Sequence, residues 1–528
     1  MHFKSIFIQT FVCFNVFLSG QLQAQNVFQI SFSNGIFMSG HDIRLSNGNY
    51  YIGGTAKQAT ASDFLLIKTN NLGDTLWTRK FHAGSPVECK QILVGDGFIY
   101  MLGNCNPGTV TSKGFIAKVG ENGLVAWTKQ YGGSGTYEFN SFELANDSLI
   151  VVSGNVTGEG AGGKDVLITM FDTSGLVKSS KAYGTPGNET GNSVTGNPEE
   201  GYFITGNTDS NDPQGDIFIL NLAADWTPVW CKSYNIIYGT NYSGQHAYDL
   251  IRIANNLLTV SGDTKVFEFP PSDEVWNPLI MKCDLSGNVI YAKDYSLNSG
   301  GGPASRVIET SDSHFVLTGY MRSTLGTLIK TTELGEPDWS RVYGTSNIGS
   351  GGLNNVSHSL LQDGTSFLLT GYIETTYDTS LFFVKTNNLG ESGCFFTDTP
   401  YCNPGTDNPT INSLNFTTTP VNTTISDLPL TVSPANASMY VYCDIPTGVK
   451  GTEDNISVFP NPVSDYIHLQ GVSQQATYQL INSLGDILET GWSHVIDVRY
   501  YQPGIYFLRI NDKGICHSYK IIHFLNCN

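Results

Sequence analysis

Tyr50-Tyr51-Ile52-Gly53-Gly54 is an apolar run that ends in glycine, and the same phrase returns six more times along the chain. The later copies end at Gly103, Gly154, Gly206, Gly262, Gly319 and Gly371. Counted from Gly54, successive copies are 49, 51, 52, 56, 57 and 52 residues apart. A fixed period of about fifty residues indicates a repeat architecture, in which each repeat is one supersecondary unit.

A second phrase follows each copy and predicts a strand that ends in a tight turn. Residues 68–73 (KTNNLG) return letter for letter as residues 385–390. The glycine supplies the positive φ that such a turn needs. A third segment predicts one more strand and contains a tryptophan in four of the units: Trp77, Trp127, Trp230 and Trp339. In the first unit we expect strands at about 40–47, 49–54, 63–69 and 75–81.

Four short strands in about fifty residues are typical of a β-propeller blade. The seventh unit lacks its tryptophan strand after Gly390, whereas residues 26–32 (NVFQISF) form an unassigned strand before the first unit. Pairing these two ends would hide an exposed sheet edge. The sequence therefore predicts an all-β fold with a seven-bladed propeller at 25–396, closed by the N-terminal strand. The repeat resembles the propeller arrays of exported Bacteroidetes-type proteins, which implies a fold rather than an activity.

The first 24 residues have the pattern of a signal peptide. Lys4 is followed by a mostly apolar run from Ile6 to Leu18, and Ala24 offers a small residue before a cleavage point. The run is shorter than the roughly 20 residues of a membrane span. Cys13 lacks the preceding small residue of a lipoprotein signal. We expect cleavage before Gln25, no lipid anchor and no transmembrane span.

Composition and charge narrow the functions that the chain can have. Charged residues make up 14% of the 528 residues, and the net charge is -18. Nucleic-acid binding requires clustered Lys and Arg, so we expect no nucleic-acid partner. The abundance of glycine (57 residues) favours turns and strands over exposed helices.

The last 130 residues differ from the repeats. Residues 397–452 are rich in Thr, Pro, Asn and Ser, which predicts an extended linker with a strand pair near 428–442. Residues 453–528 contain several short alternating strands, which predict a small C-terminal β-sandwich.

Four ordered motifs mark this C-terminal segment. They contain Phe459, Pro460, Asn461 and Pro462, then Gly485, then Pro503, Gly504 and Tyr506, and finally Lys520. In this order they resemble the type A C-terminal sorting domain of the type IX secretion system. The resemblance implies export across the outer membrane and a translocon as partner. The ending at 523–528 (HFLNCN) departs from the usual basic terminus.

Cysteines and histidines give no metal-binding pattern. None of the ten cysteines has CxxC spacing and the ten histidines are scattered, so we expect no metal and no cofactor. Export permits disulfides. The disulfide candidates, without an assigned connectivity, are Cys394, Cys402 and Cys443, with Cys516 and Cys527 as a second possibility.

The chain contains no linear catalytic motif such as HExxH, GxSxG or a P-loop. Its longest variable loops flank the fifth unit, at 236–246 and 263–277. Flat aromatic rings stack on sugars and anchor interfaces, so we hypothesise a glycan or peptide site in these loops. Its residues would be Tyr238, Tyr242, His246, Phe267, Phe269 and Trp276. The alternative interpretation is that these rings form a small core of the loop itself.

These observations favour a secreted or cell-surface protein that is not an enzyme and serves adhesion or recognition of a glycan or a surface protein. Two alternatives remain. A secreted hydrolase of polysaccharides would gather acidic residues on the propeller face, with two carboxylates in a central cleft. A structural component of the surface layer or gliding apparatus would self-associate.

Overall fold

A computed structural model describes residues 26–236, 244–253, 255–267, 274–297, 302–320, 326–343, 355–374, 379–393, 396–398, 402–405, 407–446, 457–460, 463–482, 487–512 and 515–523. Contacts divide the chain into one unit at Asn26–Ile445 and a second unit that contains Pro446–Asn528. The described residues form strands and turns without a helix, which confirms the all-β prediction. No helix in this part of the chain could therefore span a membrane.

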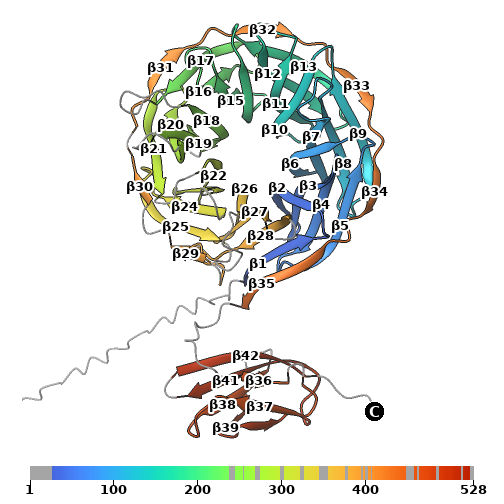
Figure 1. The fold of residues 1–528 in the computed structure, drawn as a ribbon, viewed down its shortest axis with the longest axis vertical. Helices are drawn as coiled ribbons and strands as arrows, with labels where there is room; N and C mark the ends of the chain where they lie inside the picture. Colours follow the sequence, from blue (N-terminus) through green and yellow to red (C-terminus); the bar gives the residue numbers. More distant parts are fainter. Residues whose placement is uncertain are drawn as a thin grey trace, which may run out of the picture. The chain divides into compact units, whose positions relative to one another are not determined.

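The described part of the first unit contains seven five-stranded sheets arranged around an open centre (Figure 1). The innermost strands are β2 (Phe37–Ser46), β6 (Val87–Gly95), β10 (Thr136–Asn146), β14 (Glu189–Asn197), β18 (Gln245–Ile253), β22 (Ala304–Glu309) and β26 (Asn355–Asp363). Each innermost strand contacts the next, and β26 contacts β2.

Three further strands follow outward by antiparallel pairing. The second strands are β3 (Asn49–Gln58), β7 (Phe98–Cys105), β11 (Leu149–Thr157), β15 (Gly201–Thr208), β19 (Leu257–Phe267), β23 (Phe315–Tyr320) and β27 (Ser366–Glu374). The third strands are β4 (Ala61–Asn70), β8 (Lys113–Gly120), β12 (Lys164–Asp172), β16 (Asp216–Leu222), β20 (Glu274–Asp284), β24 (Gly326–Thr331) and β28 (Thr379–Lys385). The fourth strands are β5 (Thr75–His82), β9 (Val125–Gly132), β13 (Val177–Gly184), β17 (Pro228–Asn235), β21 (Val289–Leu297), β25 (Pro337–Tyr343) and, in the last sheet, β1 (Asn26–Ser33).

Each sheet packs between two others, which explains the continuous apolar runs of the repeat. β3 is buried without interruption from Tyr50 to Ala56, because both of its faces meet neighbouring sheets. The repeated tyrosine at the end of the fourth strand links one sheet to the next. Its hydroxyl donates to a carbonyl in the turn before the neighbouring fourth strand, as from Tyr131 to Gly175 at 2.8 Å and from Tyr295 to Gly335 at 2.9 Å.

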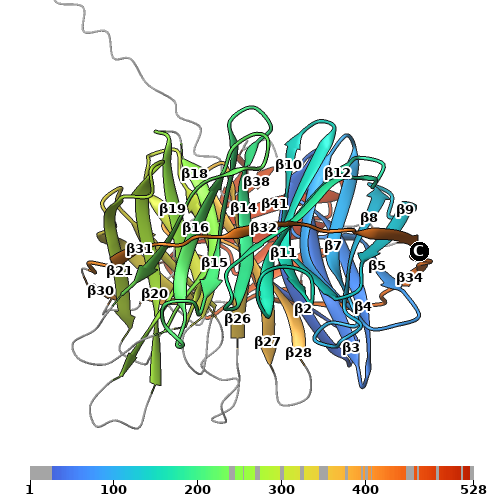
Figure 2. The same cartoon turned by 90° about the horizontal axis from the view of Figure 1, so that it is seen from above.

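The segment that the sequence presents as a linker is instead the fifth strand of every sheet. It runs around the outside of the ring, against the chain direction of the sheets, as a belt (Figure 2). The belt consists of β29 (Phe396–Asp398), β30 (Cys402–Pro404), β31 (Thr410–Ser413), β32 (Thr417–Pro420), β33 (Thr424–Asp427), β34 (Thr431–Pro434) and β35 (Ser438–Pro446). It pairs in turn with β25, β21, β17, β13, β9, β5 and β1.

A seven-residue repeat holds the belt in register with the sheets. Asp407, Leu414, Val421, Leu428 and Ala435 are buried, and each donates its backbone N–H to a carbonyl of a fourth strand. For example, the Leu414 nitrogen lies 2.9 Å from the Cys231 oxygen. Seven residues therefore carry the belt past one sheet, so the linker prediction is wrong for this segment.

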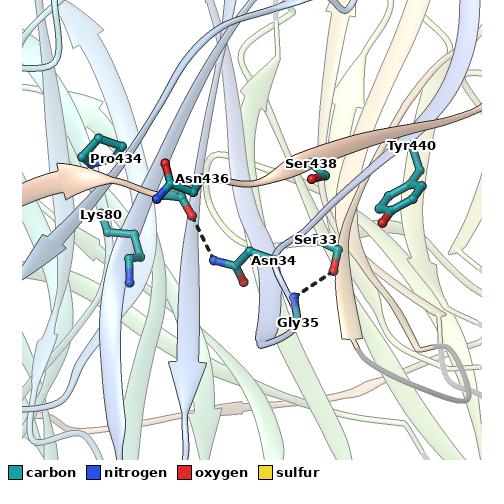
Figure 3. A pocket seen from close by; sticks show the side chains of 9 residues that line it. Ser33, Asn34, Gly35, Lys80, Pro434, Asn436, Ser438 and Tyr440 are labelled. Carbon is teal, nitrogen blue, oxygen red and sulfur yellow. Dashed lines mark hydrogen bonds between the residues drawn. The ribbon is translucent and has the colours of Figure 1, made fainter.

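The N-terminal strand lies between two parts of the chain that are distant in sequence. β1 pairs with β28 on one side, with Phe28 opposite Lys385, and with β35 on the other. The turn after β1 also contacts the belt, because the Asn34 amide donates to the Ala435 carbonyl at 2.9 Å (Figure 3). Belt and N-terminal strand thus stabilise the same sheet.

The second unit has two small sheets. One contains β36 (Ser457–Phe459), β37 (Tyr466–Gln470) and β40 (Val495–Asp497). The other contains β38 (Thr477–Asn482), β39 (Ile487–Gly491), β41 (Gly504–Asp512) and β42 (Ile515–His523). Ile467 of the first sheet and Leu480 and Leu508 of the second belong to one shared apolar core.

Candidate functional site

Each innermost strand contains a β-bulge at the same place in the repeat. The bulge interrupts the pairing between the first and second strands, for example between Gly40 and Asp42. The bulged residues of the seven strands are His41, Lys90, Asn140, Asn192, Tyr248, Ser305 and His358. A bulge re-aims a side chain, and these bulges lie near the strand ends where the crossovers between sheets arrive. We call this end of the ring the loop face.

Two of the bulged residues form hydrogen bonds that join one sheet to the next. The Asn140 amide donates to the Gly191 carbonyl of the next sheet at 3.0 Å, and the Asn192 amide donates to the Ala247 carbonyl at 2.8 Å. His41, Lys90, Tyr248 and His358 replace this asparagine in other sheets. In the repeat, the asparagine at this position joins one sheet to the next. The replacements therefore mark the sheets whose loop-face residues differ from the repeat pattern.

The residue after each repeat glycine also bonds to the next sheet in some sheets and is replaced in others. Thr55, Asn104 and Asn207 accept a backbone N–H from the next sheet, at 3.0, 2.7 and 3.0 Å. The fifth, sixth and seventh sheets have Asp263, Tyr320 and Tyr372 at this position. The diverged positions therefore gather in sheets five to seven and in the first two.

A groove of about 890 Å³ opens among the diverged positions. Its wall includes Phe37, His41, His358, Tyr372 and Glu88, and we call it the mouth groove. The rings of His41 and His358 stack with centroids 5.1 Å apart and an interplanar angle of 17°. Tyr372 lies 5.8 Å from His358 and 5.8 Å from Phe37, centroid to centroid. The groove thus offers adjoining flat rings, as sugar-binding surfaces do.

The two imidazoles of the mouth groove are neutral at ordinary pH. Burial, and to a smaller extent the neighbouring Lys90, lower the pKa of His41 to about 3. Burial likewise lowers the pKa of His358 to about 3, with smaller contributions from His41 and Lys90. Neutral imidazoles both donate and accept hydrogen bonds, which suits them to hydroxyl groups.

Two carboxylates occupy equivalent positions on neighbouring innermost strands, and one of them, Glu88, lines the groove. Glu88 of β6 and Glu138 of β10 each stand two residues before the bulge, and these two strands contact each other. Glu88 lies 2.8 Å from Lys90 and its side chain is 31% exposed. Glu138 accepts the Gly108 N–H at 3.3 Å and the Asn155 amide at 2.9 Å. Residues 106, 107 and 109 line the groove together with Glu88, and Glu138 contacts this segment through the Gly108 N–H.

The predicted aromatic cluster is placed only in part. His246 and Trp276 come together, with ring centroids 5.1 Å apart. Tyr238, Tyr242 and Phe269 lie outside the described residues. Phe267 ends β19, but its side chain is also outside the described part.

Sequence reasoning missed the group that organises this cluster. The Asp263 carboxylate holds His246 Nδ1 at 3.0 Å and accepts the Tyr248 hydroxyl at 2.9 Å. The Lys265 ammonium lies 5.6 Å from the centre of the Trp276 ring. Aligning the seven units on the repeat glycine would have found Asp263, because that position breaks the Thr/Asn pattern.

A second cavity, which we call the central channel, lies among the innermost strands and is lined by Arg44, Glu143, Asp249 and Arg306. Asp42 accepts hydrogen bonds from Arg44 and Arg306 at 3.0 Å each and from Ser359 at 2.7 Å. Asp249 accepts the Ser193 hydroxyl at 3.1 Å. Buried charges persist only when paired in this way. We therefore assign these carboxylates to joining the sheets.

The structure describes some of the residues that the metal and disulfide predictions involve, but not all of them. Among the described residues, no three His, Cys, Asp or Glu side chains gather into a metal site. Cys89, Cys105, Cys231 and Cys283 are buried free thiols. Cys394 and Cys527 lie outside the described residues, as do the side chains of Cys402, Cys443 and Cys516.

The sorting-motif residues occupy the second unit. Phe459 ends β36 and is 46% exposed, and Pro460 follows it. Gly504 begins β41, just after Pro503, and Tyr506 donates its hydroxyl to the Gln502 carbonyl at 2.6 Å. Asn461, Pro462 and Gly485 lie outside the described residues, and Lys520 is in β42 with its side chain undescribed.

Residues 457–523 match the family of secretion system C-terminal sorting domains. The match indicates secretion through the type IX secretion system to the cell surface or the extracellular space. No curated protein matches the chain.

Several solved structures are similar to the chain. An α-L-arabinofuranosidase from Fusarium graminearum shares 10% identity, with 69% of this chain and 97% of the other covered and a TM-score of 0.37. An endo-arabinase from Bacteroides thetaiotaomicron shares 11% identity over 58% and 96% of the two chains, with a TM-score of 0.24. A sialidase from Trypanosoma rangeli shares 8% identity over 92% and 84%, with a TM-score of 0.34.

These comparisons contradict the expectation of a non-enzymatic protein of adhesion or recognition, because the similar structures are glycoside hydrolases. TM-scores below 0.5 assign this chain neither a substrate nor a catalytic residue. The expectation was drawn from the absence of linear catalytic motifs. On this fold, residues of one face come from separate repeats about fifty residues apart, so a linear motif search does not detect them.

Proposed function

We propose that this protein is a secreted hydrolase that cleaves polysaccharides at the loop face of a seven-bladed β-propeller. The seven five-stranded sheets and the pairing of β1 with β28 support a ring that its N-terminal strand closes. Residues 1–24 would be removed as a signal peptide. The translocon of the type IX system would bind the C-terminal unit, of which residues 457–523 match the sorting family.

One observation carries the hydrolase proposal: Glu88 lines a groove of about 890 Å³, and Glu138 stands at the equivalent position of the contacting strand β10. Hydrolysis of a glycosidic bond uses two carboxyl groups, about 5–9.5 Å apart. One protonates the leaving oxygen, and the other attacks the sugar or activates a water molecule. Neighbouring innermost strands suit such a pair, since their side chains at one level face the same mouth.

The electrostatics of the groove fit these roles. Lys90 pairs with Glu88, and Asn155 and the Gly108 N–H hold Glu138, so the two carboxylates have different surroundings. The adjoining rings of His358 and Tyr372 provide the surface on which a sugar can stack.

The test is hydrolysis of a panel of plant and microbial polysaccharides by the full chain, measured as released reducing ends. We expect activity on at least one polymer, and we expect Glu88→Gln and Glu138→Gln each to reduce kcat by about 100-fold or more. Glu199→Gln, an exposed carboxylate at the opposite end of the sheets, is the matched control and should leave kcat unchanged. Activity that survives both substitutions would contradict the assignment, and an inactive wild-type protein would contradict the proposal.

A further inference from the structure

Aromatic side chains continue from the mouth groove around one half of the loop face. We call the aromatic arc the set His358, Tyr372, Tyr320, Tyr248, His246 and Trp276. The ring contacts are 5.8 Å between His358 and Tyr372, 6.2 Å between Tyr248 and His246, and 5.1 Å between His246 and Trp276. These residues come from the fifth, sixth and seventh sheets.

Tyr320 ends β23, in the sheet that lies between those of Tyr248 and Tyr372. Burial and then Asp263 raise the pKa of Tyr248, and Tyr320 adds to that shift. Burial and then Glu374 raise the pKa of Tyr372, where Tyr320 contributes again. The strand of Tyr320, β23, also contacts β26, which contains His358.

The arc consists of diverged repeat positions. Tyr248 and His358 are bulged residues, where other sheets have the bridging asparagines. Tyr320 and Tyr372 stand after the repeat glycine, where Asn104 and Asn207 bind the next sheet. Joining the sheets does not require aromatic residues at these positions. Binding of a ligand is therefore the simplest explanation for the row of aromatic side chains.

The acidic side chains of the arc and of the adjoining groove have hydrogen-bond or ion-pair partners close by. The Asp263 carboxylate is engaged by both His246 and Tyr248. In the adjoining groove, Glu88 lies 2.8 Å from Lys90, and the imidazoles of His41 and His358 are neutral because burial lowers their pKa. The whole chain has a net charge of -18, which repels polyanions.

We infer that the aromatic arc binds an uncharged polysaccharide chain over several sugar units, between the mouth groove and Trp276, and this inference rests on the proposed hydrolase function. Stacked rings take the flat faces of sugars, while phenol and imidazole groups exchange hydrogen bonds with hydroxyl groups. An extended row of rings over three sheets fits a chain rather than a single sugar.

The experiment measures binding separately from turnover. The full chain with Glu88→Gln and Glu138→Gln serves as the binding protein, and isothermal titration uses oligosaccharides of two and six units from arabinan, xylan and β-glucan. Polygalacturonate is the anionic probe. We expect one neutral hexasaccharide to bind about tenfold more tightly than its disaccharide, with an affinity independent of salt.

Substitutions then locate the ligand. Trp276→Ala and Phe37→Ala should each weaken hexasaccharide binding by about tenfold, and Trp276→Phe should restore most of it. Trp492→Ala, an equally large but 80% exposed ring in the other unit, is the control and should have no effect. Thermal unfolding checks that each variant is folded.

The outcomes separate this inference from the proposed function. Hexasaccharide binding that depends on Trp276, with no hydrolysis by the wild-type chain, would support the arc and overturn the hydrolase proposal. Hydrolysis that Trp276→Ala and Phe37→Ala leave unchanged would support the hydrolase and overturn the arc. Salt-dependent binding of polygalacturonate alone, or no binding of any polysaccharide, would overturn the inference.

Discussion

Glu143 shows how one residue in the channel responds to its surroundings. Burial raises its pKa from 4.5 to about 7, although the Gly196 N–H donates to it at 3.2 Å, and Asp249 adds to the shift. The folded protein therefore binds this proton more tightly than the unfolded chain does. Between pH 4.5 and 7, the contribution of Glu143 to the free energy of unfolding falls as pH rises.

We expect Glu143→Gln to raise the melting temperature at pH 8 by about 2–4 °C and to leave it unchanged at pH 4.5. Glutamine removes the ionisation but keeps an acceptor for the Gly196 N–H. Differential scanning calorimetry of both proteins across this pH range is the measurement. An equal difference in melting temperature at every pH would assign the effect to packing rather than to the proton.

His246 and Trp276 were predicted from segments of unusual length between the repeat strands, and their part in binding stays a prediction. The structure places them in β18 and β20 rather than in loops. Glu88, Glu138 and Tyr372 were not predicted. These residues lie inside strands that look ordinary one at a time. They differ from the repeat pattern only when equivalent positions of all seven repeats are compared. That comparison requires the position of the β-bulge in each innermost strand, which the structure supplies.

Among the elements, the repeat strands were predictable and the belt was not. The apolar runs before each repeat glycine exist because both faces of the second strand are buried, so the period of fifty residues could be counted directly. The belt strands are short and mostly exposed, so they resemble a linker in composition. Their signal is one buried residue in seven at Leu414, Val421, Leu428 and Ala435.

The belt pairs with the outer strand of all seven sheets, which in the last sheet is β1. Its removal should therefore lower the free energy of unfolding of the first unit. We expect residues 25–396 alone to aggregate and to unfold about 10 °C or more below residues 25–446, because seven unpaired edges invite pairing between chains. Light scattering and thermal unfolding of the two proteins test this expectation. A monomeric, equally stable protein without the belt would show that the fourth strands need no cover.

At the scale of the whole molecule, the division into units separates the sorting-family match from the site proposed for hydrolysis. Contacts place Asn26–Ile445 in one unit and Pro446–Asn528 in the other, and the sorting-family match falls within the latter. The first unit keeps its belt and all of the proposed site residues when the chain stops at 446.

We therefore expect a chain that ends at 446 to fold and keep wild-type kcat but to remain inside the outer membrane of the producing cell. Immunoblots of periplasmic and extracellular fractions measure the retention, and hydrolysis by the purified truncated protein measures the activity. Tyr506→Ala is a smaller change to the same unit, because Tyr506 belongs to the third motif and its hydroxyl donates to the Gln502 carbonyl. That variant should reduce secretion by about tenfold without lowering the melting temperature of the first unit. Export of the truncated chain at the wild-type level would separate the sorting-family match from secretion. Loss of hydrolysis on truncation would instead mean that the C-terminal unit takes part in the reaction.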